Sequence, residues 1–400
     1  MENKDFSKTK LKNGLTILHE RRERPVTTIA LATKFGSGYE SEKLKGVAHF
    51  LEHYLFRGTK KRTSLQISSA LEKVGGELNA FTAEQFTIYH VKLPSRYLGL
   101  GIDILSDLFL NPAFNPKFFD KEKQIIVEEL KMYEDDPKTY VFEKIKSLLY
   151  KKPFGLFAIG TRKSLQDMKL KNLVETHGSS YGLENSILSV VGKNSFDDIL
   201  DLTKKFLAIK RQAEIKKIKI SKISKQKIEN RRGIGQASMT FGLHIPSLQD
   251  KKRYVAEIFN AILAYGMSSK LAQEIREKRG LAYSVKGFLD QSSDYGYLVI
   301  YVGTEKSKVQ KCKEIILKEI KKLRQLKKKE LEEAKEKLIG NYTVQNEDSR
   351  NVAFTLTAEQ LAGSAEEFYD YEEKIKQIKL QEVRNFAKIK NYSFAALLPE

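Results

Sequence analysis

The sequence contains a single cysteine, Cys312, and no long apolar run. One cysteine cannot form an intramolecular disulfide framework or an all-cysteine metal site, which favours a reducing environment. No stretch approaches the roughly 20 uncharged apolar residues of a membrane-spanning helix. The amino-terminal stretch also lacks the apolar core of a signal peptide. We therefore expect a cytoplasmic protein that has no membrane as a partner.

The length and composition predict folded domains. The chain has 400 residues, which exceeds one ordinary domain. Hydrophobic residues make up 41% of the chain and charged residues 30%. This is enough apolar material for packed cores, and it excludes an intrinsically disordered chain.

The formal net charge is +20, and much of the excess lies in two runs, residues 210–232 and 306–337. The second run mixes lysine with glutamate at helical spacings, as expected for the exposed face of an amphipathic helix. Neither run is accompanied by an RNA-binding aromatic motif or a zinc-finger spacing. We therefore interpret the charge as solvated helix faces rather than as a nucleic-acid surface.

Strands and helices alternate along the first half of the chain. Turn signals and β-branched residues predict strands over 15–19, 27–35, 78–93 and 187–191. Apolar periodicity, ended by glycine or proline, predicts helices over 47–56, 65–74, 97–110, 116–133 and 196–207.

A similar order restarts after the basic segment. A strand within residues 236–248 is followed by helices over 255–263 and 270–278, and then by strands over 283–289 and 296–302. We therefore predict two similar halves. The predicted limits are a first domain over 1–210, a basic linker over 211–232 and a second domain over 233–400.

The most informative segment is GVAHFLEHYLFRGT, residues 46–59, in which His49, Glu52 and His53 form the pattern H-x-x-E-H. Helix positions four apart lie one turn apart on the same face, so both imidazoles can reach one metal ion. Glu52 projects close to that face and can contact a metal-bound water without being a ligand. The second half has Ala261 and Tyr265 near the corresponding place, so only the first half can carry this chemistry. A surface histidine pair with a salt-bridged glutamate is the alternative interpretation.

A catalytic zinc usually takes three protein ligands and leaves one position for water. The predicted helix over 116–133 offers Glu122, Glu128 and Glu129. Glu122 and Glu129 are seven residues apart and share a face, whereas Glu128 points about 100° away from Glu129. The spacing alone leaves the third ligand open, because each of these residues could be an ordinary solvated glutamate.

With its surroundings, the histidine motif resembles the insulinase, or pitrilysin, family of inverted-motif zinc peptidases, in the small bacterial branch similar to mitochondrial processing peptidase. The resemblance covers nearly the whole chain. It includes GSGYE at 36–40, LNAFTAEQFT at 78–87, NPAF at 111–114, VEELKMYEDDP at 127–137 and IREKRGLAYSV at 275–285. It implies an α+β fold of two similar αβ domains, each a mainly antiparallel sheet packed with helices, forming half of a clamshell chamber.

The resemblance also implies one zinc ion per chain, bound by His49, His53 and Glu129. The glutamate lies 76 residues after the second histidine (129 − 53 = 76), which matches the family spacing. Glu52 is then the general base of a zinc metalloendopeptidase that hydrolyses peptides or unfolded segments. Glu122 matches a neighbouring acidic position that tunes the site, with an ordinary helix-surface role as the alternative.

Residues 78–82 resemble the exposed edge strand to which a substrate of this family adds as a further strand. This implies that Asn79, Ala80 and Phe81 bind substrate. The chain departs from the family just beyond, where Gln85 and Phe86 replace a frequent Glu-His pair. The sequence therefore does not predict which polar contacts this segment makes.

In the second half, Arg276 and Tyr283 match the family's Arg/Tyr pair. The resemblance implies that Tyr283 donates its hydroxyl to the developing oxyanion, and that Arg276 holds the substrate backbone or positions the tyrosine. In long family members, zinc lies in the first of four similar domains and this pair in the fourth. A two-domain chain is therefore expected to form a homodimer with composite active sites, or a heterodimer with an inactive paralogue.

Two other functions are weighed against the peptidase. One is a non-catalytic family member that acts as a structural or partner subunit. Such members have typically lost ligands, whereas His49, Glu52, His53 and Glu129 are all present here. The other is a basic nucleic-acid-binding protein, which would show strongly salt-dependent binding to DNA.

Overall fold

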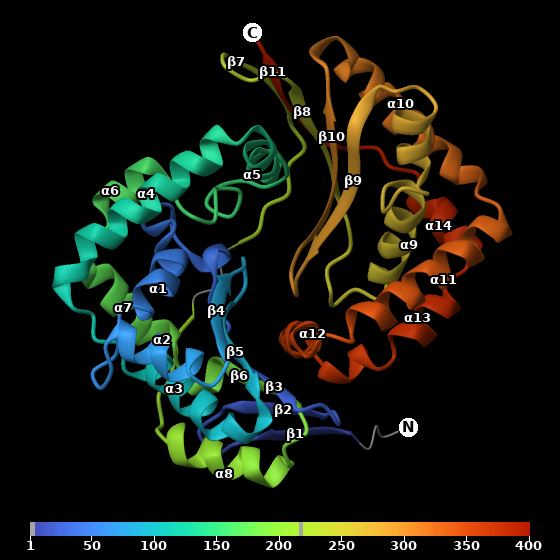
Figure 1. Cartoon of the computed structure of the whole chain (residues 1–400). Coiled ribbons are helices and arrows are strands. Elements are labelled where there is room, and N and C mark those ends of the chain that lie inside the picture. The colour runs from blue at the N-terminus through green and yellow to red at the C-terminus, as the bar shows by residue number, and fades with distance from the viewer. Residues whose placement is uncertain (1–4, 216–218) are drawn as a thin grey trace. The chain divides into compact units, whose positions relative to one another are not determined.

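The computed structural model describes residues 5–215 and 219–400 (Figure 1). Residue contacts divide the chain into two compact units. Unit 1 consists of Met1–Leu130, Phe157–Ile218 and Asn346–Phe368, and unit 2 consists of Lys131–Leu156, Lys219–Gln345 and Tyr369–Glu400. Each unit therefore combines segments that are far apart in the sequence.

Unit 1 contains a six-stranded sheet with helices on both faces. Its strand order is β1 (Phe6–Lys10), β2 (Thr16–Arg21), β6 (Ser186–Gly192), β3 (Val26–Thr33), β5 (Thr87–Pro94) and β4 (Glu77–Thr82). Its helices are α1 (Val47–Leu55), α2 (Ser64–Glu72), α3 (Leu98–Leu110), α4 (Phe119–Asp135, which continues past Leu130), α6 (Arg162–Asp167), α7 (Leu170–Ser180), α8 (Phe196–Phe206) and α12 (Ser349–Ala362). β2 and β6 are parallel, and the other neighbours are antiparallel.

The side chains of β3 point alternately to the two faces of the sheet, and their contacts show which helix covers each face. The hydroxyl of Thr28 lies 2.8 Å from that of Ser349 at the start of α12. Ile29, the next residue, lies beside Gly101 of α3. Because successive strand side chains point to opposite faces, α3 and α12 cover opposite faces of the sheet.

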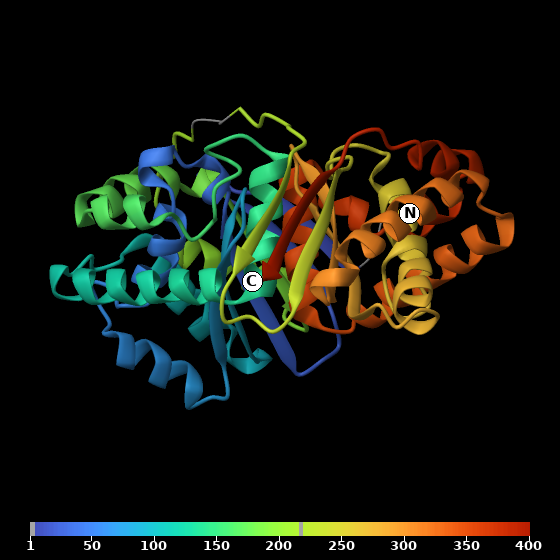
Figure 2. The same cartoon turned by 90° about the horizontal axis from the view of Figure 1, so that it is seen from above.

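Unit 2 contains a five-stranded sheet in the order β7 (Gln226–Arg231), β11 (Ser393–Pro399), β8 (Ala237–His244), β10 (Gly296–Thr304) and β9 (Ala282–Gln291). Figure 2 shows the red strand β11 between the two yellow-green strands β7 and β8. The helices of this unit are α5 (Pro137–Leu149), α9 (Arg253–Leu263), α10 (Val309–Lys322), α11 (Lys328–Gln345), α13 (Tyr371–Gln377) and α14 (Leu380–Phe386). A π-helical turn, Ala272–Glu277, precedes β9.

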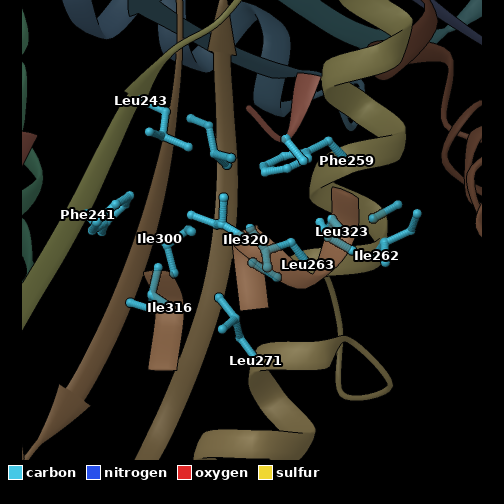
Figure 3. Packing of buried hydrophobic residues seen from close by; sticks show 14 of the residues in the cluster. Phe241, Leu243, Phe259, Ile262, Leu263, Leu271, Ile300, Ile316, Ile320 and Leu323 are labelled. Atoms are coloured by element: carbon cyan, nitrogen blue, oxygen red, sulfur yellow. The ribbon is translucent and has the colours of Figure 1, made fainter. Parts of the chain in front are cut away.

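The core of unit 2 lies between its sheet and α9 and α10 (Figure 3). Phe241 of β8 and Ile300 of β10 are fully buried against Phe259 of α9 and Ile316 of α10. α5 covers the opposite face, where the hydroxyl of Thr240 donates to the carbonyl of Val141 at 3.1 Å.

The two sheets share one topology. The order β2-β6-β3-β5-β4 corresponds to β7-β11-β8-β10-β9, and in both sheets the first pair is parallel and the remaining pairs are antiparallel. This confirms the prediction of two similar α+β domains. Each sheet is mainly antiparallel, as predicted, and contains one parallel pair whose two strands are joined by a long crossover.

The domain limits drawn from the sequence differ from these units. Residues 131–156, expected in the first domain, belong to unit 2, and residues 346–368, expected in the second, belong to unit 1. Each exchanged segment carries the helix at the same place in the repeat, α5 in one half and α12 in the other. A local sequence pattern predicts a helix but does not say which sheet it covers.

The predicted basic linker over 211–232 contains strand β7, so its later part is not a linker. Its residues 216–218 lie outside the described residues, as do residues 1–4 of the predicted first domain. This strand was not predicted because its sequence, QKIENR, is mostly charged or polar. It lies at the edge of its sheet, and its Ile228 is 57% exposed.

Most other predicted elements are present within one to three residues of their expected limits. The stretch predicted as strand over 78–93 is a hairpin of β4 and β5. Residues 137–180, for which no element was expected, form α5, α6 and α7. The lysine-rich run over 306–337 forms α10 and part of α11, with ion pairs such as Lys322–Glu319 at 2.7 Å. Within the described residues, no helix has the length and apolar character needed to cross a membrane.

Candidate metal centre

The start of α1 is fixed by a buried carboxylate. Glu40 accepts hydrogen bonds from the backbone N–H groups of Gly46 at 2.9 Å and Ala48 at 2.7 Å. These donors would otherwise be unsatisfied at a helix amino terminus. Gly46 has φ +93°, and a Cβ atom there would lie 2.4 Å from the carbonyl oxygen of Ile159. The GSGYE segment thus ends in the residue that caps the histidine-bearing helix.

Apolar residues of the motif anchor α1 in unit 1. Val47, Phe50, Leu51 and Leu55 are buried. The ring of Phe50 stacks on that of Phe119, the first residue of α4, with 5.2 Å between centroids. This contact holds the histidine helix against the helix that carries the candidate glutamates.

The structure brings His49, His53 and Glu129 together. One potential ligand atom from each of these residues lies within 4.8 Å of the other two. Nε2 of His49 is 3.7 Å from Oε1 of Glu129, and Nε2 of His53 is 3.4 Å from Oε2. Glu128, on another face of α4, takes no part in this group of described residues.

These distances fit a metal ion. Ligand atoms about 2.1 Å from a tetrahedral zinc ion lie about 3.4 Å from one another. Within the described part of the chain, Oε2 of Glu129 and Nδ1 of His49 are buried without a hydrogen-bond partner. Burial, and then the charge of His53, lower the pKa of His49 to about 3, so its imidazole is in the neutral form that a metal requires.

His53 is oriented by a second carboxylate. Its Nδ1 lies 3.1 Å from Oε1 of the buried residue Glu122. The other oxygen of Glu122 accepts a hydrogen bond from Nε of Arg57. Burial raises the pKa of Glu122, but its hydrogen bonds with His53 and Arg57 outweigh burial and lower it overall. Burial lowers the pKa of His53. The hydrogen bond to Glu122 and the charges of the nearby carboxylates outweigh burial, so the pKa of His53 is raised overall.

Glu52 lies on the same helix between the histidines and has a different partner. Its Oε2 accepts a hydrogen bond of 2.6 Å from the hydroxyl of Thr82, the last residue of β4. Burial raises the pKa of Glu52, and the hydrogen bond from Thr82 offsets only part of that rise. The carboxylate is thus held beside the histidine–glutamate group without belonging to it.

Comparison with known proteins places the chain in a family. Residues 15–181 match the family described as insulinase (peptidase family M16), and residues 167–338 match the peptidase M16 inactive domain. A protein of Rickettsia bellii (strain RML369-C) named an uncharacterized zinc protease is 31% identical, over 86% of this chain and 84% of its own length. The chain belongs to the insulinase family of peptidases.

Other similar proteins extend over almost the full length of the chain. An uncharacterized zinc protease of Bacillus subtilis (strain 168) is 27% identical over 97% of each chain. The crystal structure of a protease from Helicobacter pylori has a TM-score of 0.92 at 22% identity and covers 98% of this chain and 99% of its own. A peptidase M16 inactive domain from Pseudomonas fluorescens has a TM-score of 0.89 at 18% identity and covers 99% of this chain and 98% of its own. At these identities the two structures establish the shared fold alone.

The residues predicted to bind substrate in this insulinase-family chain lie in two places. Asn79, Ala80 and Phe81 are on β4, an edge strand of the unit 1 sheet. The backbone N–H of Ala80 donates to the Asn79 side chain at 2.8 Å, so one edge donor is occupied by a neighbouring side chain. Phe81 packs on Phe86 with 5.9 Å between ring centroids, so the departure at Phe86 supplies an apolar contact.

Arg276 and Tyr283 are in unit 2. Arg276 lies in the π-helical turn, and its Nη1 is 3.1 Å from Sδ of Met267. Tyr283 is the second residue of β9 and is 57% exposed. Both residues belong to unit 2, whereas the histidine–glutamate group belongs to unit 1.

The sequence interpretation missed Glu40, Arg57 and Thr82. Glu40 and Thr82 lie within segments that carry the family resemblance, yet no spacing rule connects them to α1. Arg57 lies four residues after His53 and just beyond the end of α1, and this short separation in sequence is a weak signal that the two residues share a partner. Each of these contacts depends on how elements pack, and periodicity does not determine packing.

Proposed function

We propose that this chain is a zinc metalloendopeptidase that hydrolyses peptides or unfolded segments. The observation that carries the proposal is the convergence of His49, His53 and Glu129 from two helices, with Glu52 held beside them. Two imidazole nitrogens and one carboxylate oxygen are a typical donor set of a catalytic zinc site. When bound, zinc acts as a Lewis acid that lowers the pKa of water and polarises a peptide carbonyl.

The chain's own residues supply the proton transfer. Glu52 takes a proton from the attacking water and returns it to the leaving amine, as a general base and then a general acid. Its raised pKa, caused by burial, makes protonation easier than for a solvated carboxylate. The hydroxyl of Thr82 fixes one oxygen of Glu52, which leaves the other for the proton transfer.

The remaining roles follow from the family resemblance. Backbone groups along Asn79, Ala80 and Phe81 bind an extended substrate as an added strand, which suits the edge position of β4. Tyr283 donates to the oxyanion and Arg276 holds the substrate backbone. The exposure of Tyr283 is compatible with a partner or substrate contact.

The assembly that we propose is a homodimer that encloses a chamber, with zinc from one subunit and the Arg276–Tyr283 pair from the other. Mixing a Glu52→Gln subunit with a Tyr283→Phe subunit tests it, because each mixed dimer then holds one intact composite site. Recovery of activity on mixing is expected. A mixture that stays inactive contradicts composite sites. The cytoplasmic location stays a prediction.

The peptidase assignment is tested by metal analysis and fluorogenic-peptide cleavage for the wild type and Glu52→Gln. We expect both proteins to bind zinc and only the wild type to cleave. A wild type that cleaves nothing after zinc is added would favour the non-catalytic alternative. A wild type that also binds no zinc would overturn the metal site.

A further inference from the structure

Tyr283 occupies a β-bulge at the start of β9. In the register with β10, Ser284 pairs with Gly303 and Ala282 pairs with Thr304, so Tyr283 is the extra residue. A bulge of this kind interrupts the regular alternation and re-aims a side chain, often beside an active site. The position of this tyrosine is therefore set by an irregularity in the strand.

The ring of Tyr283 lies over Gly303 of the neighbouring strand. A Cβ atom at Gly303 would come within 2.5 Å of the Tyr283 hydroxyl oxygen and within 2.6 Å of Cζ. Real side chains do not approach so closely, so any residue other than glycine would displace the ring. The absence of a side chain at Gly303 creates the space that Tyr283 fills.

A second tyrosine, Tyr301, lies two residues before Gly303 on the same face of β10. It is buried, and its ring stacks on Phe142 of α5 with 5.6 Å between centroids. Its hydroxyl is 3.3 Å from that of Ser238 on β8. Burial raises the pKa of Tyr301 to about 12, although the hydrogen bond with Ser238 lowers it in part and the neighbouring Tyr283 adds to the rise. The hydroxyl of Tyr283 lies over Gly303, the next residue of β10 on the face of Tyr301, so three hydroxyl groups form a row across β8, β10 and β9.

We propose that Tyr301 is a positioning residue that holds the hydroxyl of Tyr283 in place, while the ring of Tyr283 packs over Gly303. In this row Ser238 donates to Tyr301, and Tyr301 donates to the oxygen of Tyr283. Since a hydroxyl has one hydrogen to donate, Tyr283 then keeps its own hydrogen for a ligand. Each bond in such a chain polarises the next, which makes the last hydroxyl a better donor.

Packing alone does not require the Tyr301 hydroxyl. A phenylalanine would fill the same space against Phe142, without placing a polar group in a buried position. A buried hydroxyl is destabilising unless it has hydrogen-bond partners. The inference rests on the proposed function, in which Tyr283 donates to the substrate oxyanion.

The first test is spectroscopic and does not depend on activity. The full-length zinc-loaded protein is labelled with 3-fluorotyrosine, and the Tyr283 resonance is identified by its loss in Tyr283→Phe. We expect this resonance to shift in Tyr301→Phe and in Gly303→Ala. The matched control is Tyr297→Phe, on the same strand and face, which removes a hydroxyl that donates to Asp290 at 2.6 Å. The control is expected to leave the Tyr283 resonance in place.

The second test is kinetic. Removing an oxyanion donor typically lowers kcat by about 100-fold or more, which is the loss expected for Tyr283→Phe. We expect Tyr301→Phe to lower kcat by about 10-fold, with KM changed less than about 2-fold, because it affects a transition-state contact. In a Tyr283→Phe background, Tyr301→Phe is expected to have no further effect on kcat.

The outcomes separate this proposal from the peptidase assignment. An unmoved Tyr283 resonance in Tyr301→Phe overturns the positioning role, whatever the activity and whatever Gly303→Ala does. A shifted resonance with wild-type kcat, or equal losses of kcat from Tyr301→Phe with and without Tyr283, also overturns it. A wild type that cleaves no peptide defeats the proposed function, while the resonance shift still reports whether Tyr301 positions Tyr283.

Discussion

Nδ1 of His53 lies 3.1 Å from Oε1 of Glu122, and Nε of Arg57 holds the other oxygen of the same carboxylate. A proton on Nδ1 that is donated to Glu122 leaves Nε2 with its lone pair on the side of Glu129. Nε2 lies 3.4 Å from that second carboxylate. Glu122 is therefore placed to favour the imidazole tautomer whose Nε2 can bind a metal, and this role does not require Glu122 to be a ligand itself.

Replacing Glu122 with glutamine is expected to weaken zinc binding by about 10–100-fold, as is typical when the partner of a ligand histidine is lost. Arg57→Leu should have a smaller effect, because the Glu122 carboxylate remains beside His53. Competition with a chromogenic chelator measures both affinities. Asp120→Asn, an exposed change on the first turn of α4, is the control. Wild-type affinity in Glu122→Gln would show that Glu122 does not orient His53.

Glu129→Gln is expected to lose most bound zinc, because an amide oxygen is a much weaker ligand than a carboxylate. Glu128→Gln offers a matched control one residue away. It removes the same charge from the same helix but lies outside the histidine–glutamate group. Zinc content after exhaustive dialysis, measured by mass spectrometry, compares the two. Equal zinc retention would assign the third ligand elsewhere.

The sequence predicts those parts of the site that depend on local periodicity. The spacing of His49 and His53 follows from the helical repeat, and so does the shared face of Glu122 and Glu129. Residue spacing alone left Glu122, Glu128 and Glu129 open, and only the family resemblance favoured Glu129. In the structure Glu129 lies beside both histidines, because α4 packs against α1 through Phe50 and Phe119.

Other features depend on long-range packing that no local pattern encodes. One example is that α5, from the first half of the chain, belongs to unit 2, whereas α12, from the second half, belongs to unit 1. Nothing in the sequence of either helix indicates which sheet it covers. The bulge at Tyr283 is another, because it arises from the register between β9 and β10. Strand β7 was missed for a different reason. Its side chains are mostly charged, and its place beside β11 is maintained by backbone pairing.

Thr82→Val is expected to lower kcat by about 5-fold, the effect of losing one hydrogen bond of about 1 kcal/mol. The substitution keeps the shape of the side chain but frees the carboxylate of Glu52, which then samples unproductive orientations. Zinc content should stay at the wild-type level. Thr203→Val, which removes a buried hydroxyl from α8, is the control. A Thr82→Val enzyme with unchanged kcat would mean that Glu52 is positioned without this contact.

In unit 2, Glu229 of β7 is expected to make stability depend on pH. Its carboxylate accepts a hydrogen bond of 2.5 Å from the hydroxyl of Tyr140. It also forms ion pairs with Lys144 at 2.9 Å and with Lys227 at 2.6 Å. Burial raises the pKa of Glu229, but the bonds from Lys227, Tyr140 and Lys144 outweigh burial and lower it to about 2. The ordinary value is about 4.3, so folding favours the charged form.

A carboxylate whose folded pKa is depressed stabilises the protein above its unfolded pKa, and this contribution is lost as the pH falls toward the folded value. Glu229→Gln is therefore expected to reduce the free energy of unfolding by about 1–2 kcal/mol at pH 7, allowing for partial solvent screening. The difference should shrink between about pH 5 and pH 3. Urea unfolding at several pH values measures it, with Glu314→Gln as the control, since that exposed residue pairs with Lys311 at 3.8 Å. A difference that is constant from pH 7 to pH 3 would mean that the charge of Glu229 is not what stabilises the contact between β7 and α5.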